Sequence, residues 1–136
     1  MANTFKLKLV NSERVLLDRD AEFVLLRTVA GDMGILPNHS PFVAELAIGE
    51  MKIKSGGSDD YFFVSGGFME ISKQNVVTIL ADEAMSAKEI DIERARREVE
   101  IAEAKLKKIQ EDKEILLTQR ALQEALTKIS IAEKHM

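Results

Sequence analysis

The sequence predicts an α+β protein in which a body of short β-strands is followed by a pair of α-helices. All seven Gly and both Pro lie before Ser86, among short runs of alternating apolar and polar residues that are typical of strands and turns. The residues after Ser86 contain no Gly or Pro and are rich in Ala, Glu, Lys, Arg, Ile and Leu, which suit helices. We therefore expect a β-domain over residues 1–85 and a helical domain over residues 86–136.

Strand patterns recur along the body at the spacing expected of a β-sandwich or barrel. Residues 5–9 alternate as a half-buried strand does, whereas residues 22–28 are apolar on both faces, which indicates a more buried strand. Gly66 and Gly67 indicate a bulge or a tight turn between two strands. Together with the first two segments, about eight to ten short strands are expected. The other candidates include residues 14–17, 43–46, 51–54, 61–64, 68–71 and 76–80.

Charge and composition exclude several classes of protein. The net charge is −4, and neither the body nor the tail carries a basic patch, so we expect no nucleic-acid partner. The absence of Cys excludes disulfides and thiolate metal sites. No apolar run approaches ~18 residues, and the N-terminus lacks the layout of a signal peptide. We therefore expect exposure to the cytosol and no transmembrane helix.

Residues 30–41, AGDMGILPNHSP, are expected to form an irregular loop, because two Gly and two Pro interrupt any strand ladder. The loop presents Asp32 and His39, which could simply be solvated polar residues on a long connection. A hydrolase using these two residues is an alternative, but no Ser or Cys stands in a recognisable triad setting. His135 is the only other His, so no metal site is expected. We predict no catalytic residues.

This loop resembles the G-x-[LM]-G-I-x-P-x-H-x-P signature of the epsilon subunit of bacterial rotary F-type ATP synthases. Residues 64–70 resemble the second signature of that family, and residues 76–82 resemble its last strand. The tail from Ser86 resembles its helical hairpin, so the likeness runs over nearly the whole chain. The resemblance implies a ten-stranded β-sandwich followed by an antiparallel two-helix hairpin. It also implies a non-catalytic subunit that requires no cofactor.

The resemblance further implies that the sandwich docks on the gamma subunit of the central stalk and on the ring of c subunits. The subunit would couple transmembrane proton flow to ATP synthesis, although the choice between H⁺ and Na⁺ is made in the c subunits. Asp32 would meet the polar loops of the ring, and His39 would lie towards gamma or the ring. Such a subunit is peripheral, at the cytoplasmic face of the bacterial plasma membrane. The matching interface residues are Gly31, Asp32, Met33, Gly34 and His39.

Two apolar stripes mark the tail, each with the 3, 4, 3, 4, 3 spacing of a helix face. Six residues separate the stripes, or ~600° at ~100° per residue, which leaves them roughly 120° apart on one straight helix. This phase break favours two helices folded back on each other, with a bend near residues 110–112. We expect a capping box of Ser86 and Glu89 to begin the first helix, and Asp112 to cap the second. The stripes are Ile92, Ala95, Val99, Ala102, Leu106 and Ile109, then Ile115, Thr118, Leu122, Ala125, Ile129 and Ala132.

The stripes contain many alanines, which bury far less area than a Leu or Ile worth ~1.5–3 kcal/mol. We therefore expect the folded hairpin to be only modestly favoured over an opened tail. The resemblance implies that the tail extends along gamma toward the alpha and beta subunits and blocks ATP hydrolysis. The alternative is a β-sandwich scaffold with a static coiled-coil tail.

Some members of the family bind ATP on the folded hairpin through an I-D-x-x-R-A motif and basic residues of the second helix. Residues 90–95 match this motif in full, and Arg94 could approach a phosphate while Asp91 accepts from the nucleoside. Glu124, Lys128 and Ile101 stand where the family has further arginines, so the resemblance implies weak ATP binding at most. The site residues implied are Ile90, Asp91, Arg94, Ala95, Arg120 and Lys128.

Overall fold

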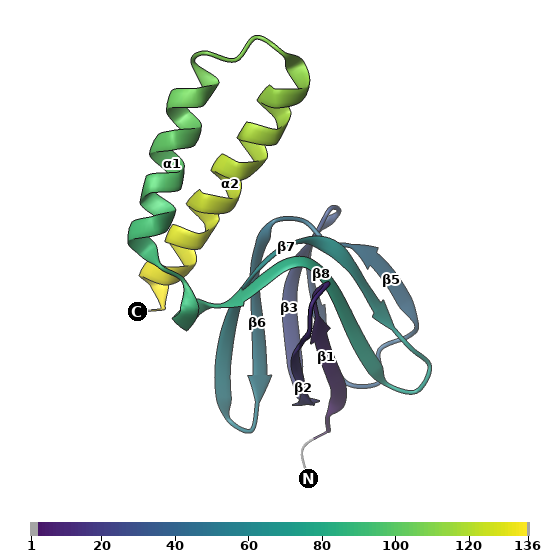
Figure 1. Cartoon of the computed structure of the whole chain (residues 1–136). Coiled ribbons are helices and arrows are strands. Elements are labelled where there is room, and N and C mark those ends of the chain that lie inside the picture. The colour runs from purple at the N-terminus through teal and green to yellow at the C-terminus, as the bar shows by residue number, and fades with distance from the viewer. Residues whose placement is uncertain (1–2, 136) are drawn as a thin grey trace. The chain divides into compact units, whose positions relative to one another are not determined.

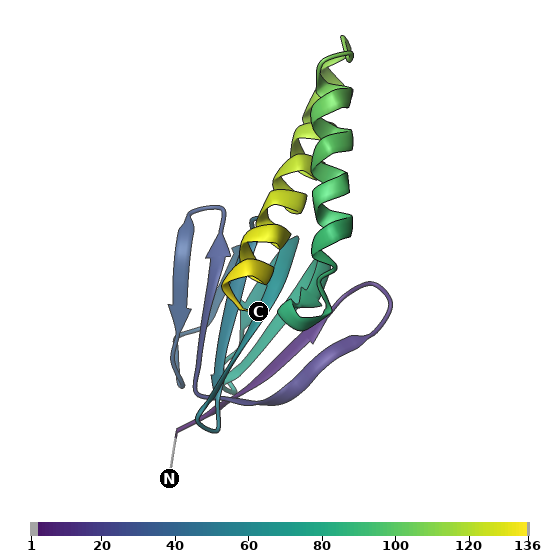
Figure 2. The ribbon, with the colours of Figure 1, turned by 90° about the vertical axis from the view of Figure 1, so that its left-hand side faces the viewer.

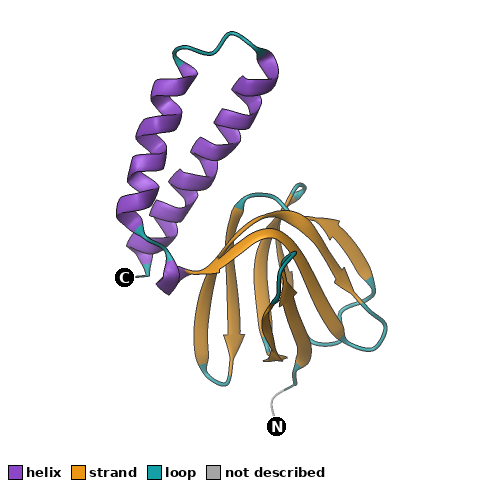
Figure 3. Cartoon of the chain, viewed as in Figure 1, coloured by secondary structure: helices purple, strands orange, loops and turns teal. Residues whose placement is uncertain are grey.

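The protein, described by a computed structural model over residues 3–135, divides into two compact units, one up to Ser86 and one from Ala87. The first unit is built of strands and the second of helices (Figure 1, Figure 3). This agrees with the predicted α+β class.

The strand unit forms one continuous set of paired strands in the order β2-β1-β8-β7-β6-β3-β4, with β5 paired to β7. The pairs are antiparallel except β1 with β8, which is parallel. The strands are β1 (Phe5–Val10), β2 (Val15–Ala21), β3 (Phe23–Thr28), β4 (Gly31–Ile35), β5 (Phe42–Glu45), β6 (Gly49–Ser55), β7 (Ser58–Ile71) and β8 (Val76–Ser86).

The long strands β7 and β8 belong to both layers of the sandwich. The first part of β7 pairs with β6, whereas residues 68–71 pair with β5. The bend lies at Gly66 and Gly67, whose φ angles of 70° and 104° favour glycine. A Cβ on Gly67 would lie 1.9 Å from the carbonyl oxygen of Leu80, so only glycine fits there.

This bend corrects two expectations. Gly66 and Gly67 form neither a bulge nor a turn, because the β7–β8 register continues unchanged from Ser65 opposite Glu83 to Gly67 opposite Ala81. The ten predicted strands become eight described ones, because β7 and β8 each supply a segment to both layers. The sandwich class itself is confirmed.

The apolar side of each strand meets in one core between the layers. Strand alternation places Leu7 and Leu9 of β1 there, together with Val24, Ile53 and Ile79, and all five are wholly buried. Each such side chain contributes about 1.5–3 kcal/mol on burial. The sandwich is therefore stabilised mainly by large aliphatic side chains.

The second unit contains a short 3₁₀ turn (Ala87–Glu89) and two helices, α1 (Ile92–Leu106) and α2 (Asp112–Lys134). The helices lie side by side and run in opposite directions (Figure 1, Figure 2). Every residue of the two predicted stripes is buried or half-buried. No helix of the described chain is long and apolar enough to cross a membrane.

The helix ends differ from the prediction. Ser86 is the last residue of β8, where it pairs with Phe62, and it is followed by the 3₁₀ turn Ala87–Glu89 rather than by the first α-helix. The N-cap of α1 is Asp91, whose Oδ1 accepts a hydrogen bond from the backbone N–H of Arg94 at 3.1 Å. α2 begins at Asp112 itself, and Glu111 precedes it without a side-chain cap. The predicted bend is correct to within a few residues.

Candidate functional site

Asp32 lies on β4 rather than in a loop, which corrects the prediction for residues 31–35. Its cross-strand partner is Arg27 of β3, and the Arg27 Nε lies 3.0 Å from the Asp32 Oδ1. More than half of each side chain is exposed. The hydrogen bond from Arg27 holds the pKa of Asp32 below its usual range, and the positive charge of Arg27 adds to this effect. The same hydrogen bond and the negative charge of Asp32 raise the pKa of Arg27. Asp32 is therefore a charged surface group held in place by a partner on the neighbouring strand.

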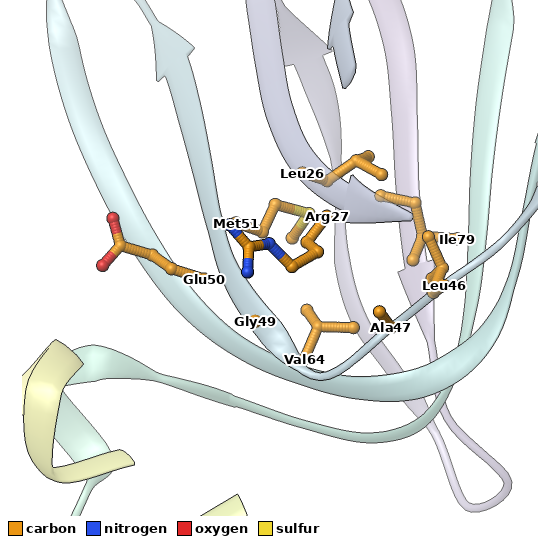
Figure 4. A pocket seen from close by; sticks show the side chains of 9 residues that line it. All are labelled: Leu26, Arg27, Leu46, Ala47, Gly49, Glu50, Met51, Val64 and Ile79. Atoms are coloured by element: carbon orange, nitrogen blue, oxygen red, sulfur yellow. The ribbon is translucent and has the colours of Figure 1, made fainter. Parts of the chain in front are cut away.

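Gly49 makes room for the stem of Arg27, since a Cβ on Gly49 would lie 2.8 Å from the Arg27 Cβ. Beside this stem lies a cavity of about 10 Å³, too small for any ligand beyond a single water. In Figure 4 the side chain of Arg27 crosses this cavity, whereas the carboxylate of Glu50 points away from it. The cavity is therefore a small packing gap rather than a ligand site. It is lined by Leu26, Arg27, Leu46, Ala47, Gly49, Glu50, Met51, Val64 and Ile79.

His39 lies in the true loop, residues 36–41, beyond the far end of β4 from Asp32. Its Nδ1 lies 2.7 Å from the carbonyl oxygen of Ser40, so Nδ1 carries the proton in this arrangement. The ring meets the Phe42 ring edge-on, with centroids 6.4 Å apart. The structure does not bring Asp32 and His39 together as a catalytic pair. The interface roles of Gly31, Asp32, Met33, Gly34 and His39 remain predictions.

Three large apolar side chains on one outer face of the sandwich were missed by sequence reasoning. Phe68 of β7 pairs with Leu80 of β8. Val43 of β5 pairs with Glu70, which is two residues along β7 from Phe68, so Val43 lies on the same face. They are 53%, 53% and 66% exposed, respectively. Single exposed apolar residues are normal, but a cluster of them marks an interaction site. We call Val43, Phe68 and Leu80 the outer patch. Glu45 and Glu70, on the same face, border it with negative charge.

The alternation of β7 and β8 could have revealed the outer patch. Phe68 and Leu80 fall on the polar phase of strands whose other phase is buried, as Met69 and Ile79 show. An apolar residue on the polar phase of a strand signals a surface that requires a partner.

The matched I-D-x-x-R-A motif performs structural tasks in the hairpin. Asp91 caps α1, and the Arg94 Nε lies 3.2 Å from the Glu98 Oε1. Ala95 is buried in the seam between the helices, and Ile90 is half-buried at the start of the unit. Asp91 and Arg94 therefore already have partners that a nucleotide would have to displace.

The basic residues of α2 lie at different levels of the hairpin. Lys128 is eight residues beyond Arg120, which is about 12 Å along a helix. An ion pair of 3.6 Å between Arg96 and Glu133 shows that the end of α2 lies beside the beginning of α1. Of these two basic residues, Lys128 is thus the nearer to Arg94, and Arg120 lies toward the hairpin bend. The Arg120 Nε lies 3.6 Å from the Glu124 Oε1, so Arg120 pairs with this carboxylate. Within residues 3–135 no acidic or histidine cluster could hold a metal ion.

The chain matches two family models over nearly all of its length. Residues 4–87 match the β-sandwich domain of the ATP synthase delta/epsilon chain. Residues 88–133 match the long α-helix domain of the same chain.

The relatives that the chain resembles belong to the same family as the two matching models. The chain is 60% identical over 133 residues to the sodium-ion-specific ATP synthase epsilon chain of Propionigenium modestum, covering 98% of this chain and 96% of that relative. It is 40% identical over 129 residues to the ATP synthase epsilon chain of Bacillus velezensis, covering 95% and 97%. A chain in the mitochondrial ATP synthase of Euglena gracilis, solved as OSCP, F1 and c-ring, has a TM-score of 0.82 at 28% identity, covering 99% of this chain and 83% of that one.

Proposed function

Because this chain belongs to the epsilon subunits of F-type ATP synthases, we propose that the outer patch is its docking surface for the gamma subunit of the central stalk. A subunit of this family is a non-catalytic part of the stalk. The observation that carries the proposal is the exposure of Val43, Phe68 and Leu80 on one sheet face. Covering apolar surface contributes about 25 cal/mol per Å², so these three side chains supply the apolar centre that interfaces require.

The charged end of the β3–β4 hairpin suits a different partner. Arg27 and Asp32 present one charge of each sign at an exposed strand pair, and Val29 beside them is also exposed. We assign this end, with Gly31, Met33 and Gly34, to the polar loops of the c ring. A sandwich whose core is filled by large side chains can pass torque between two such partners without deforming.

Substitutions in the outer patch test the gamma assignment. Phe68→Asp should weaken the affinity for the gamma subunit by about tenfold or more, which corresponds to about 1.4 kcal/mol. Val15→Asp is the matched control, because Val15 is equally exposed at 52% but lies on the edge strand β2. The measurement is titration of each variant against the purified complex that lacks this subunit. Equal affinities for the two variants would contradict the assignment.

We also propose that the helical tail restrains ATP hydrolysis by extending toward the alpha and beta subunits. The seam supports this, because five of the six buried residues described in the two helices are small and hold the helices weakly. They are Ala95, Ala102, Thr118, Ala125 and Ala132, and Ile131 is the large one. Deleting residues 87–136 should raise the ATPase activity of the reconstituted complex. Unchanged activity would favour the static-tail alternative.

Weak ATP binding on the hairpin is a further part of the proposal, with Arg94 as the phosphate contact. Since Arg94 pairs with Glu98 in the free chain, phosphate has to replace this carboxylate. Glu98→Gln should therefore strengthen binding, and Arg94→Ala should abolish it. Titration with ATP while following hairpin resonances by NMR measures both. No change at millimolar ATP in the Glu98→Gln variant would rule out a nucleotide role.

The complex would place the subunit at the cytoplasmic face of the bacterial plasma membrane, as a peripheral component. The family resemblance implies coupling to proton flow, whereas the Propionigenium relative is named sodium ion specific. The ion is chosen in the c subunits, so the test is whether Na⁺ stimulates ATP hydrolysis by the intact complex from the same cell.

A further inference from the structure

Asn75 joins three separate segments of the sandwich. It lies in the turn between β7 and β8 with a φ of +64°, a left-handed conformation that Asn tolerates better than most residues. Its Oδ1 accepts a hydrogen bond from the backbone N–H of Asn38 at 2.7 Å. Its Nδ2 donates to the carbonyl oxygen of Thr4 at 2.9 Å, and its own carbonyl accepts from the N–H of Lys6 at 3.2 Å. The side chain therefore ties residues 36–41 to the turn and to the start of β1.

The loop needs such an anchor. Pro37 and Pro41 have no N–H to donate, and Asn38 itself has a φ of +61°, which costs free energy in a residue other than glycine. Leu36 is largely exposed, so the loop has little apolar contact to hold it. The hydrogen bond from Asn38 to Asn75 reaches the loop from outside and offsets the unfavourable backbone conformation.

His39 follows Asn38 directly, and its ring is set by the carbonyl of Ser40 and by Phe42. We propose that Asn75 is a positioning residue, which fixes the backbone of Asn38 and so presents His39 in a preformed orientation for docking. The proposal rests on the role expected for His39 at the interface with gamma or the c ring. A preformed loop binds more tightly, because less conformational freedom is lost on association.

Two substitutions distinguish the effect of the Asn75 side-chain hydrogen bonds from the effect of its left-handed backbone conformation. Asn75→Gly keeps the left-handed backbone but removes both side-chain bonds, whereas Asn75→Asp keeps the Oδ1 acceptor for Asn38 and replaces the donor to Thr4 by a carboxylate oxygen, which that carbonyl repels. Amide exchange at Asn38 in the full-length chain should become about tenfold faster or more in Asn75→Gly and stay near the original rate in Asn75→Asp. A thermal melt of each variant checks that the sandwich stays folded.

Docking on the complex that lacks this subunit supplies the second measurement. Asn75→Gly should weaken docking about as much as His39→Ala does, and Asn75→Asp should dock as the unchanged chain does. If His39→Ala docks normally, the loop assignment fails, while Asn38 exchange still decides the anchoring role. The positioning role is overturned by unchanged exchange at Asn38 in Asn75→Gly. It is equally overturned if Asn75→Asp keeps the slow exchange at Asn38 but loses as much docking as Asn75→Gly.

Discussion

The sandwich core and the hairpin seam are both apolar, but they bury side chains of different sizes. Wholly buried residues of the sandwich include Phe5, Leu7 and Ile79, whereas the buried residues described in the helices are mostly alanines, with Thr118 and one large side chain, Ile131. A buried Leu or Ile contributes about 1.5–3 kcal/mol, and an alanine much less. The difference predicts that the sandwich is the more stable unit, and that the unit proposed to move is held more weakly.

The strongest test of the rigid unit is its bend. Gly67→Ala should destabilise the chain by more than about 3 kcal/mol, because the new methyl group would collide with the Leu80 carbonyl and no side chain there can give way. Urea unfolding measures this. Gly56→Ala is the control: Gly56 also has a positive φ, of 58°, but no atom lies within 4 Å of its added Cβ, so we expect about 1 kcal/mol. Similar losses in both variants would show that the bend is not constrained by close packing.

The next test compares equivalent truncations in the two units. Ile79→Ala should cost about 2–5 kcal/mol, since it leaves a cavity in a fully buried core. Leu106→Ala, in the half-buried part of the seam, should cost no more than about 1 kcal/mol. Unfolding should be followed by a probe in each unit. A larger loss for Leu106→Ala would contradict the contrast between core and seam.

Alternation and helix spacing were enough to predict most strands and both helices, because each unit buries one regular face. The missed features depend on contacts distant in sequence. The Gly-rich stretch at residues 31–35 becomes β4 only because it pairs with β3 through partners such as Arg27 and Asp32. Ser86 and Glu89 had the sequence of a cap for the first α-helix, yet β8 extends through Ser86 by pairing with Phe62, and α1 begins only at Ile92. Tertiary pairing overrides local preference in both cases.

The functional surfaces were predicted unevenly for a related reason. The loop signature and the I-D-x-x-R-A motif can be read from adjacent residues, so they were found. The outer patch brings together Val43, Phe68 and Leu80 from three strands, and only the register places them on one face. Likewise, the role of Asn75 depends on Asn38, which is 37 residues away.

A smaller effect is expected at the one polar residue buried in the seam. Thr118→Val places a more apolar side chain of the same size at a position that is only 6% exposed, and should stabilise the folded hairpin by about 0.5–1 kcal/mol. Amide exchange across α2 should slow, and inhibition of ATP hydrolysis by the assembled subunit should weaken, because opening the tail becomes harder. Thr127→Val is a control of the same chemistry on the outer part of the helix, although it also loses a hydrogen bond to the Gln123 carbonyl. Stronger inhibition by Thr118→Val would contradict an opening tail.

The smallest effect is expected at the exposed pair of Arg27 and Asp32. The folded-state pKa of Asp32 is lowered, so its contribution to stability is present above its unfolded pKa of about 4 and is lost as the pH falls through the folded value. Asp32→Asn should therefore lower stability slightly at neutral pH and leave it unchanged in strong acid. The loss should shrink in 1 M salt, where charges are screened within about 3 Å. Glu13→Gln, at another exposed carboxylate, is the control. A large loss at neutral pH would mean that the pair supports the fold; a small loss combined with weaker docking would assign it to the interface.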